Sequence, residues 1–352
     1  MTHVVTATDG KTDLDEIGPV IRLPNCGAEW KSKWSFLRDA SWNWAKHSIG
    51  RISDVIEREV PDALLITGGP FLYFEIAHRL NKKLGLPYIL DFRDPFVNYL
   101  NERRKWRNII AKILERRWSK RASGILVPIK EMIPYVNLQN GIPVCVVENG
   151  YDDLIWHEVA QIDSYNFDRE FLKRDGTDTV LVYAGKFHRS PINLLRALKK
   201  WSESTLRRGQ LVYIGDQIPE QTVREWKKSF PLVNMGFKEY RTSLEIIKSC
   251  DIGVIISSGR VFEATTKIYD YISFGKPVLV IGSAKDGAIK SILRNYGNYV
   301  MCEDKEDDIF RGIMSIIDIG KTGDEIEIAA QHRWGRRYQA SKLADFLERI
   351  VP

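Results

Sequence analysis

The chain has 352 residues, of which 44% are hydrophobic and 28% charged, and its formal net charge is +6. This length exceeds what one hydrophobic core usually organises, so we expect two domains with a ligand site in the cleft between them. The sequence contains no low-complexity tract and no internal repeat, which excludes a disordered, fibrous or repeat protein.

Cysteine spacing and hydropathy indicate a cytoplasmic protein. The four cysteines are widely separated and form no CxxC pair, which argues against a zinc site and a disulfide framework. Residues 1–16 lack the pattern of a secretory signal, and no segment approaches the ~20 apolar residues that a spanning helix needs. We expect the protein in the cytoplasm, either free or peripheral on the cytoplasmic face of a membrane.

Short apolar segments bounded by glycine, proline or polar residues predict the strands of the first half. These segments are 3–9, 20–24, 63–69, 88–94, 124–129 and 144–150. Helical spacing is expected at about 30–60 and at 71–84. Strands that alternate with helices indicate right-handed βαβ units and a parallel sheet.

The same alternation restarts after a polar stretch at 151–178, which is typical of a linker. Strands are predicted at 179–185, 210–216, 233–237, 251–257, 277–282 and 298–303, with helices between them and a last helix at about 333–350. The predicted fold class is α/β with two Rossmann-like, doubly wound domains, at 1–165 and 176–330. The final segment, 331–352, is a helix that we expect to pack back on the first domain.

The most informative segment is 265–279, where a loop, a short helix and Gly-Lys-Pro follow a predicted strand. Free N–H groups at the helix start suit a diphosphate, and Lys267 adds a full charge. Asp270, one turn further on, could accept hydrogen bonds from ribose hydroxyls. The alternative is structural: Thr266 caps the helix, Lys267 and Asp270 are solvated, and 275–277 ends the helix.

This segment resembles the donor-site segment of retaining GT-B glycosyltransferases of the GT4 type, also called glycosyltransferase group 1, which commonly reads T/G-K-x-x-E-Y-x-x-x-G-K/R-P. Further matches follow in family order at 69–70, 90–95, 147–152, 183–187 and 235–237. The resemblance covers almost the whole chain. It implies a GT-B fold, with the nucleotide-sugar donor held by the second domain.

The resemblance also assigns roles to residues of the second domain. Lys186 and Lys267 would neutralise the donor diphosphate and act as the catalytic cations, and Arg189 would assist them. Asp270 takes the place of the glutamate that holds the ribose, whereas Glu263 stands one residue out of register with the family's first glutamate. The further donor-side residues are Gly185, Gly215 and Thr266.

Asp91, Arg93 and Asp94 cluster at the carboxyl end of a strand in the first domain, which is the acceptor side of such folds, and Gly69 follows the preceding strand. Asp91 or Asp94 could orient or deprotonate an acceptor hydroxyl. The alternative is that Arg93 pairs with a neighbouring carboxylate and fixes the loop. An Asp-x-Asp pattern at 13–15 lies in a polar loop, and we predict that no metal or other cofactor is required.

A basic segment in the first domain suggests contact with a membrane. Between Asn101 and Arg121 there are nine Lys or Arg, with Trp106 and Trp118 among them. Tryptophans and basic residues also occur together at 30–46. These segments could rest on an anionic membrane near a lipid-linked acceptor, although core packing is the commoner use of tryptophan.

The resemblance implies a retaining, metal-independent glycosyltransferase that moves a sugar from a UDP or GDP donor to a cell-surface polysaccharide or glycolipid, with no nucleic acid as partner. The alternatives are an inactive protein that binds a sugar nucleotide, and an enzyme like the UDP-sugar 2-epimerases, which would need paired carboxylates and a histidine. Members of the family begin with a strand and a glycine-rich loop ahead of the segment that matches 3–9. We therefore expect a strand of the first sheet to be missing.

Overall fold

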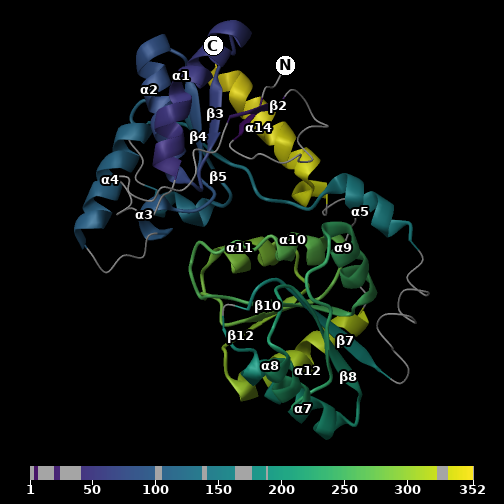
Figure 1. Cartoon of the computed structure of the whole chain (residues 1–352). Coiled ribbons are helices and arrows are strands. Elements are labelled where there is room, and N and C mark those ends of the chain that lie inside the picture. Colours follow the sequence, from purple (N-terminus) through teal and green to yellow (C-terminus); the bar gives the residue numbers. More distant parts are fainter. Residues whose placement is uncertain are drawn as a thin grey trace. The chain divides into compact units, whose positions relative to one another are not determined.

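Apolar strands and amphipathic helices alternate along the chain and form two α/β units (Figure 1). The computed structural model describes residues 4–6, 20–23, 41–99, 105–136, 141–162, 177–187, 189–322 and 332–351. The first unit comprises Met1–Val147 and Lys342–Pro352, and the second comprises Glu148–Ser341. The prediction of two parallel, Rossmann-like domains is confirmed.

In the second unit, the described strands form a six-stranded parallel sheet in the order β12-β11-β10-β7-β8-β9. The strands are β7 (Thr179–Ala184), β8 (Gly209–Ile214), β9 (Leu232–Asn234), β10 (Ile252–Ile256), β11 (Val278–Ile281) and β12 (Tyr299–Cys302). The helices are α5 (Asp153–Ala160), α7 (Ile192–Thr205), α8 (Glu220–Lys227), α9 (Tyr240–Ser249), α10 (Lys267–Ser273), α11 (Ala288–Arg294) and α12 (Glu306–Thr322). From β7 the chain adds β8 and β9 on one side of the sheet, and then returns to add β10, β11 and β12 on the other side of β7. The strand order therefore reverses between β7 and β10.

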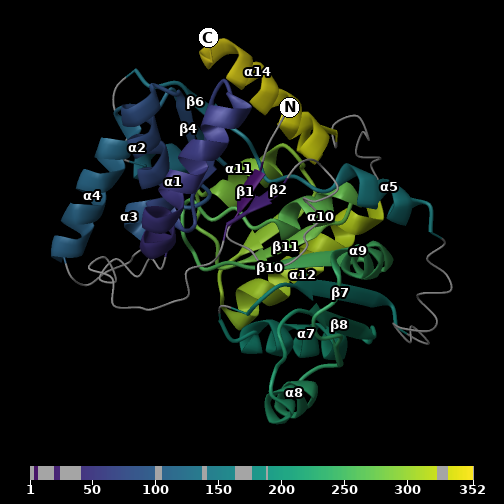
Figure 2. The same ribbon diagram turned by 45° about the horizontal axis from the view of Figure 1, so that its top comes forward.

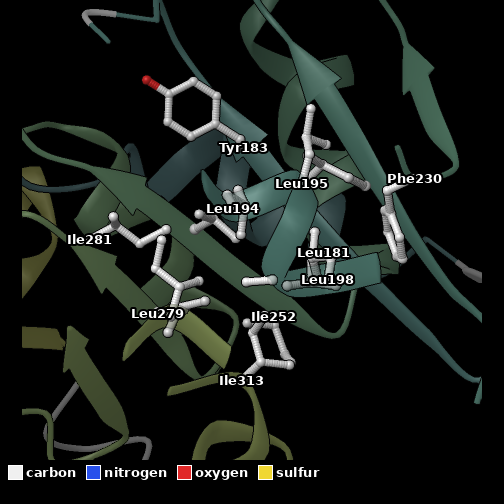
Figure 3. Close-up of a cluster of buried hydrophobic side chains, with 14 of the residues drawn as sticks. Leu181, Tyr183, Leu194, Leu195, Leu198, Phe230, Ile252, Leu279, Ile281 and Ile313 are labelled. Carbon is white, nitrogen blue, oxygen red and sulfur yellow. The ribbon is translucent and has the colours of Figure 1, made fainter. Parts of the chain in front are cut away.

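Helices cover both faces of this sheet, with α9, α10 and α11 on one face and α7 and α12 on the other (Figure 1). Every residue of β7, β10 and β11 is consequently buried, which explains why these strands are continuous apolar segments in the sequence. The core on the α7 and α12 side gathers Leu198, Ile252 and Ile313 among its members (Figure 3). Each such buried side chain contributes roughly 1.5–3 kcal/mol.

The first unit contains a four-stranded parallel sheet of described strands in the order β3-β4-β5-β6, beside a two-stranded pair, β1-β2. The strands are β1 (Val4–Thr6), β2 (Val20–Arg22), β3 (Leu64–Thr67), β4 (Tyr88–Asp91), β5 (Gly124–Val127) and β6 (Val144–Val146). The helices are α1 (Ser41–Glu59), α2 (Phe74–Leu84), α3 (Phe96–Tyr99), α4 (Lys105–Ser119) and the end of α14 (Arg336–Ile350).

Two apolar clusters hold this unit together. On one side, α1 and α2 pack through residues such as Trp44, Ile56 and Ile76. On the other, Phe346 of α14 packs against Ile89 and Leu126 of the sheet. A Cβ at Gly124 would lie 2.8 Å from the Phe346 ring, so this strand start needs glycine for α14 to approach.

The structure differs from the predicted linker at one point, because α5 begins inside the polar stretch 151–178. The Asp152 carboxylate caps this helix by accepting hydrogen bonds from the N–H groups of Leu154 and Ile155, each at 3.1 Å. Val159 is fully buried, and the Trp156 indole donates to the carbonyl of Ser273. Because the stretch 151–178 is polar on average, its sequence did not indicate this short amphipathic helix. Residues 163–176 of the same stretch lie outside the described residues.

Candidate functional site

The carboxyl edge of the six-stranded sheet brings together the loops that the sequence analysis selected. In the strand order, β7 and β10 are neighbours, and the chain leaves β7 towards one side of the sheet and β10 towards the other. Loops that diverge at such a point leave room for a ligand at the carboxyl ends of the two strands. Lys186 and Arg189 follow β7, whereas Glu263 and Lys267 follow β10.

The loop after β7 is fixed by aromatic stacking. The Phe187 ring stacks on both Tyr183 and Tyr213, with ring centroids 4.4 and 4.6 Å away. Because Phe187 turns back onto the sheet, the Lys186 side chain is left exposed, and its Nζ lies 3.6 Å from Oδ2 of Asp216. An exposed pair of this kind contributes little to stability, so the Lys186 ammonium is available to a stronger anion.

Two glycines allow this loop to approach the end of β8. Gly185 has φ of 132°, in the region that favours glycine, and its N–H donates to the carbonyl of Ile214 at 2.8 Å. A Cβ at Gly215 would lie 2.3 Å from the carbonyl oxygen of Gly185. These glycines therefore shape the backbone of the candidate site.

The loop after β10 is fixed by Glu263. One carboxylate oxygen, Oε2, accepts hydrogen bonds from the Ser257 hydroxyl at 2.7 Å and from the N–H and hydroxyl of Ser258 at 2.9 and 2.8 Å. Three donors on one oxygen hold this residue within the loop. Glu263 is therefore placed where it shapes the loop that carries Lys267.

Arg189 connects the two loops. Its Nη2 donates to the carbonyl of Ser258 at 2.7 Å, so a side chain that follows β7 contacts the backbone that follows β10. Gly259 and Gly282 lie against the guanidinium, because a Cβ built at either would be 3.3 Å from one of its nitrogens. The cation thus lies among three strand ends, those of β7, β10 and β11.

Lys267 begins α10, and its charge faces a buried carboxylate. Lys267 Nζ lies 4.0 Å from Oδ2 of Asp270, which is 3% exposed, while the Tyr240 hydroxyl donates to Oδ1 of Asp270 at 2.8 Å. Burial raises the pKa of Asp270 to about 6, although Lys267, the Tyr240 hydrogen bond and Arg336 act in the opposite direction. Asp270 is thus a buried partner of Lys267 rather than a solvated residue.

Thr266 does not behave as the structural alternative requires. Its backbone is helical, with φ of −61° and ψ of −29°, and its side chain makes no capping hydrogen bond. Since α10 has only seven residues, its dipole is small, and the full charges of Lys186, Arg189 and Lys267 are the dominant attraction for an anion.

Two tyrosines of this region were not selected from the sequence. Tyr240 lies thirty positions before Asp270 and belongs to another helix, so no local spacing links them. The Tyr271 hydroxyl lies between β7 and β10, where it accepts from the N–H of Ala184 at 3.1 Å and lies 3.2 Å from the carbonyl oxygen of Val254. It is fully buried and helps to hold the two strands together.

In the first unit, Asp91 and Arg93 form the pair that the structural alternative anticipated. Oδ2 of Asp91 accepts from Arg93 Nε at 3.0 Å and from the Thr67 hydroxyl at 3.2 Å, and burial raises the pKa of Asp91. Asp94 is exposed beyond the end of β4. Gly69 follows β3 with φ of 99°, a conformation that favours glycine.

Some sequence predictions concern residues outside the described parts of the chain, namely the Asp-x-Asp pattern at 13–15 and the basic, tryptophan-bearing residues at 30–40. In the described residues, no three His, Cys, Asp or Glu gather into a group that could hold a metal. Over the same parts of the chain, no helix is both long and apolar enough to cross a bilayer.

Two Rossmann-like parallel sheets define the class of fold, and solved structures share it. No protein-family model matches the chain, and no curated protein matches it in sequence. A glycosyltransferase from Rickettsia africae matches with a TM-score of 0.66 and 13% identity, over 99% of this chain and 90% of that one.

Two ligand-bound structures show the same likeness. Anabaena HepE in complex with UDP and glucose matches with a TM-score of 0.65 and 14% identity, over 98% of this chain and 91% of that one. UDP-GlcNAc 2-epimerase from Neisseria meningitidis, bound to UDP-GlcNAc, matches with a TM-score of 0.58 and 13% identity, over 92% and 84%. The chain therefore has the GT-B fold of these glycosyltransferases and epimerases.

Proposed function

We propose that the protein is a glycosyltransferase that uses a UDP- or GDP-sugar, and that its donor diphosphate binds at the carboxyl edge of the second unit's sheet. The observation that carries this proposal is that Lys186 and Arg189 follow β7 and Lys267 begins the helix after β10, at the point where the strand order reverses. Structures of the same fold bind UDP and UDP-sugars, which supports a nucleotide-sugar partner.

The chemistry of transfer explains why cations belong there. As the glycosidic bond breaks, negative charge grows on the departing diphosphate and positive charge grows on the sugar. Lys186 and Lys267, already in place, stabilise the transition state more than the ground state. The donors of a helix as short as α10 add little to them.

The finer features of the proposal follow from the motif resemblance of the donor segment. The sugar is transferred with retention of configuration by attack from the same face, with no enzyme nucleophile and no metal. On the acceptor side, the carboxylate of Asp91 or that of Asp94 orients or deprotonates the acceptor hydroxyl. The acceptor is a cell-surface polysaccharide or a glycolipid, and the reaction takes place in the cytoplasm or at its membrane face.

Epimerisation of a UDP-sugar at C2 is the second candidate, because UDP-GlcNAc 2-epimerases share the fold. The two reactions leave different products, since transfer releases the nucleoside diphosphate whereas epimerisation returns a UDP-sugar of inverted C2. Incubation with UDP-GlcNAc and chromatography of the nucleotides therefore separates them. A C2 epimer formed without UDP release would replace the transfer proposal.

The direct test measures nucleotide release from a panel of UDP- and GDP-sugars, with and without a membrane glycolipid extract as acceptor. Transfer predicts acceptor-dependent release of UDP or GDP, reduced at least tenfold in Lys267→Ala. Lys199→Ala, on the far side of the sheet in α7, is the matched control and keeps full activity. Tight nucleotide binding with no turnover on any acceptor would instead indicate an inactive binding protein.

A further inference from the structure

Helix α4 of the first unit presents an apolar stripe on its exposed face. Trp106, Ile109 and Ile113 lie three and four positions apart, so they occupy one side of the helix. Their exposed fractions are 47%, 58% and 60%, although each belongs to a residue type that usually avoids water. Both views place α4 beside α2 and α3 (Figures 1 and 2). The exposed fractions of the three side chains show that neither helix covers the stripe.

Contacts on the opposite side prevent the helix from rotating to bury the stripe. The indole of fully buried Trp118 donates to Oε2 of Glu75 at 2.8 Å, and the Tyr88 hydroxyl donates to the carbonyl of Trp118 at 2.5 Å. Arg117 and Arg79 also pair with Glu75. Burial alone would raise the pKa of Glu75, but these donors lower it, so the carboxylate is charged and holds α4 in this orientation.

The exposed side of α4 is also cationic. Lys112 and Arg116 of α4, and Lys120 directly after it, are exposed and follow the apolar stripe at spacings of three and four residues. The acidic residue of the helix, Glu115, is fully buried. The face therefore combines apolar side chains with positive charge, and α4 itself contributes no exposed carboxylate to it.

We infer that this face of α4 docks on an anionic lipid surface, with Trp106, Ile109 and Ile113 entering the boundary between headgroups and acyl chains. Apolar side chains flanked by Lys and Arg are the combination that binds such a surface, because the basic residues are attracted to the lipid phosphates while the apolar side chains enter the acyl boundary. A second copy of the same face fits poorly, because a two-fold contact would bring like charges together. The inference does not depend on sugar transfer.

Cosedimentation of the full chain with vesicles tests this inference. Vesicles of phosphatidylcholine with an equal part of phosphatidylglycerol should bind the protein at least tenfold more strongly than phosphatidylcholine alone. Ile109→Ser with Ile113→Ser should lower the partition constant at least tenfold. A second double variant, Lys112→Glu with Arg116→Glu, should do the same and also abolish the dependence on salt.

Two matched controls test whether the loss of vesicle binding is specific to the exposed face of α4. Leu206→Ser removes an apolar side chain that is 91% exposed at the end of α7 in the second unit, and Lys82→Glu reverses a charge on the exposed side of α2. Both controls should bind vesicles like the unchanged protein. All variants should keep their circular dichroism and their affinity for UDP, which separates lipid docking from the donor site.

Equal binding to neutral and anionic vesicles, or unchanged binding by both α4 double variants, would overturn the inference. So would analytical ultracentrifugation in which the unchanged protein dimerises and the α4 variants are monomers, since the stripe would then be a contact between copies.

Discussion

The pH dependence of stability should reveal the buried carboxylate beside Lys267. Burial raises the pKa of Asp270 from its ordinary 3.8 to about 6, against the opposing effects of Lys267 and the Tyr240 hydrogen bond. A raised pKa in the folded state means that folding favours the protonated form. The stabilising contribution is therefore complete below the unfolded pKa and is lost as the pH rises through about 6.

The magnitude follows from the two pKa values. A tenfold change in an equilibrium is worth about 1.4 kcal/mol, so raising the pKa from 3.8 to about 6 corresponds to about 3 kcal/mol. About 2 kcal/mol of this should appear between about pH 4.5 and about pH 8. Asp270→Asn cannot ionise, and its amide oxygen can still accept from Tyr240. The variant should therefore gain about 2 kcal/mol relative to the unchanged protein over that interval.

Urea unfolding followed by tryptophan fluorescence, at both pH values, measures this difference. Asp286→Asn serves as the control, because it makes the same chemical change at a carboxylate that is 91% exposed. The amide nitrogen that Asp270→Asn introduces will face Lys267 at every pH. The test therefore compares how the free energy of unfolding changes with pH, and not its absolute value at one pH. A difference between Asp270→Asn and the unchanged protein that is equal at both pH values would refute the reasoning.

Three further perturbations test other parts of the site. Glu263→Ala should lower the free energy of unfolding by about 2–3 kcal/mol, because the buried Ser257 hydroxyl loses its acceptor. Glu263→Gln should lower it less, and equal losses for the two variants in chemical denaturation would contradict this reasoning. Gly215→Ala should lower the melting temperature because its Cβ meets the Gly185 carbonyl, whereas Gly50→Ala, with open space in α1, should not, and calorimetry compares them. EDTA should leave sugar transfer unchanged, and activity restored only by added Mg²⁺ would disprove metal independence.

The fold could be predicted because the inner strands of each sheet are buried on both faces. Strands such as β7 and β10 are then uninterrupted apolar segments, visible without knowledge of their partners. Helix α5 was missed because its amphipathic turns lie in a segment that is polar on average, and its Asp152 cap is a single residue. Burial depends on tertiary neighbours, so the sequence could not tell that Trp118 is core whereas Trp106 is exposed.

The sequence predicted which segments form the candidate site, because these segments follow predicted strands. Lys186 comes directly after one predicted strand, Lys267 begins the helix that follows the loop after another, and parallel strands bring their carboxyl ends to one edge. The environment of Asp270 could not be foreseen, because Tyr240 comes from a different helix. The roles of these lysines and of the acceptor-side residues stay predictions.

The central claim is that a nucleoside diphosphate binds against the cations at the carboxyl edge of the second unit's sheet. Calorimetric titration of the protein and of Lys267→Ala with UDP, GDP and ADP tests it most directly. The account predicts that UDP or GDP binds measurably to the unchanged protein and at least tenfold more weakly to the variant, a loss of about 1.4 kcal/mol or more. Equal affinity in the two proteins, or no binding of any of the three nucleotides, would contradict it.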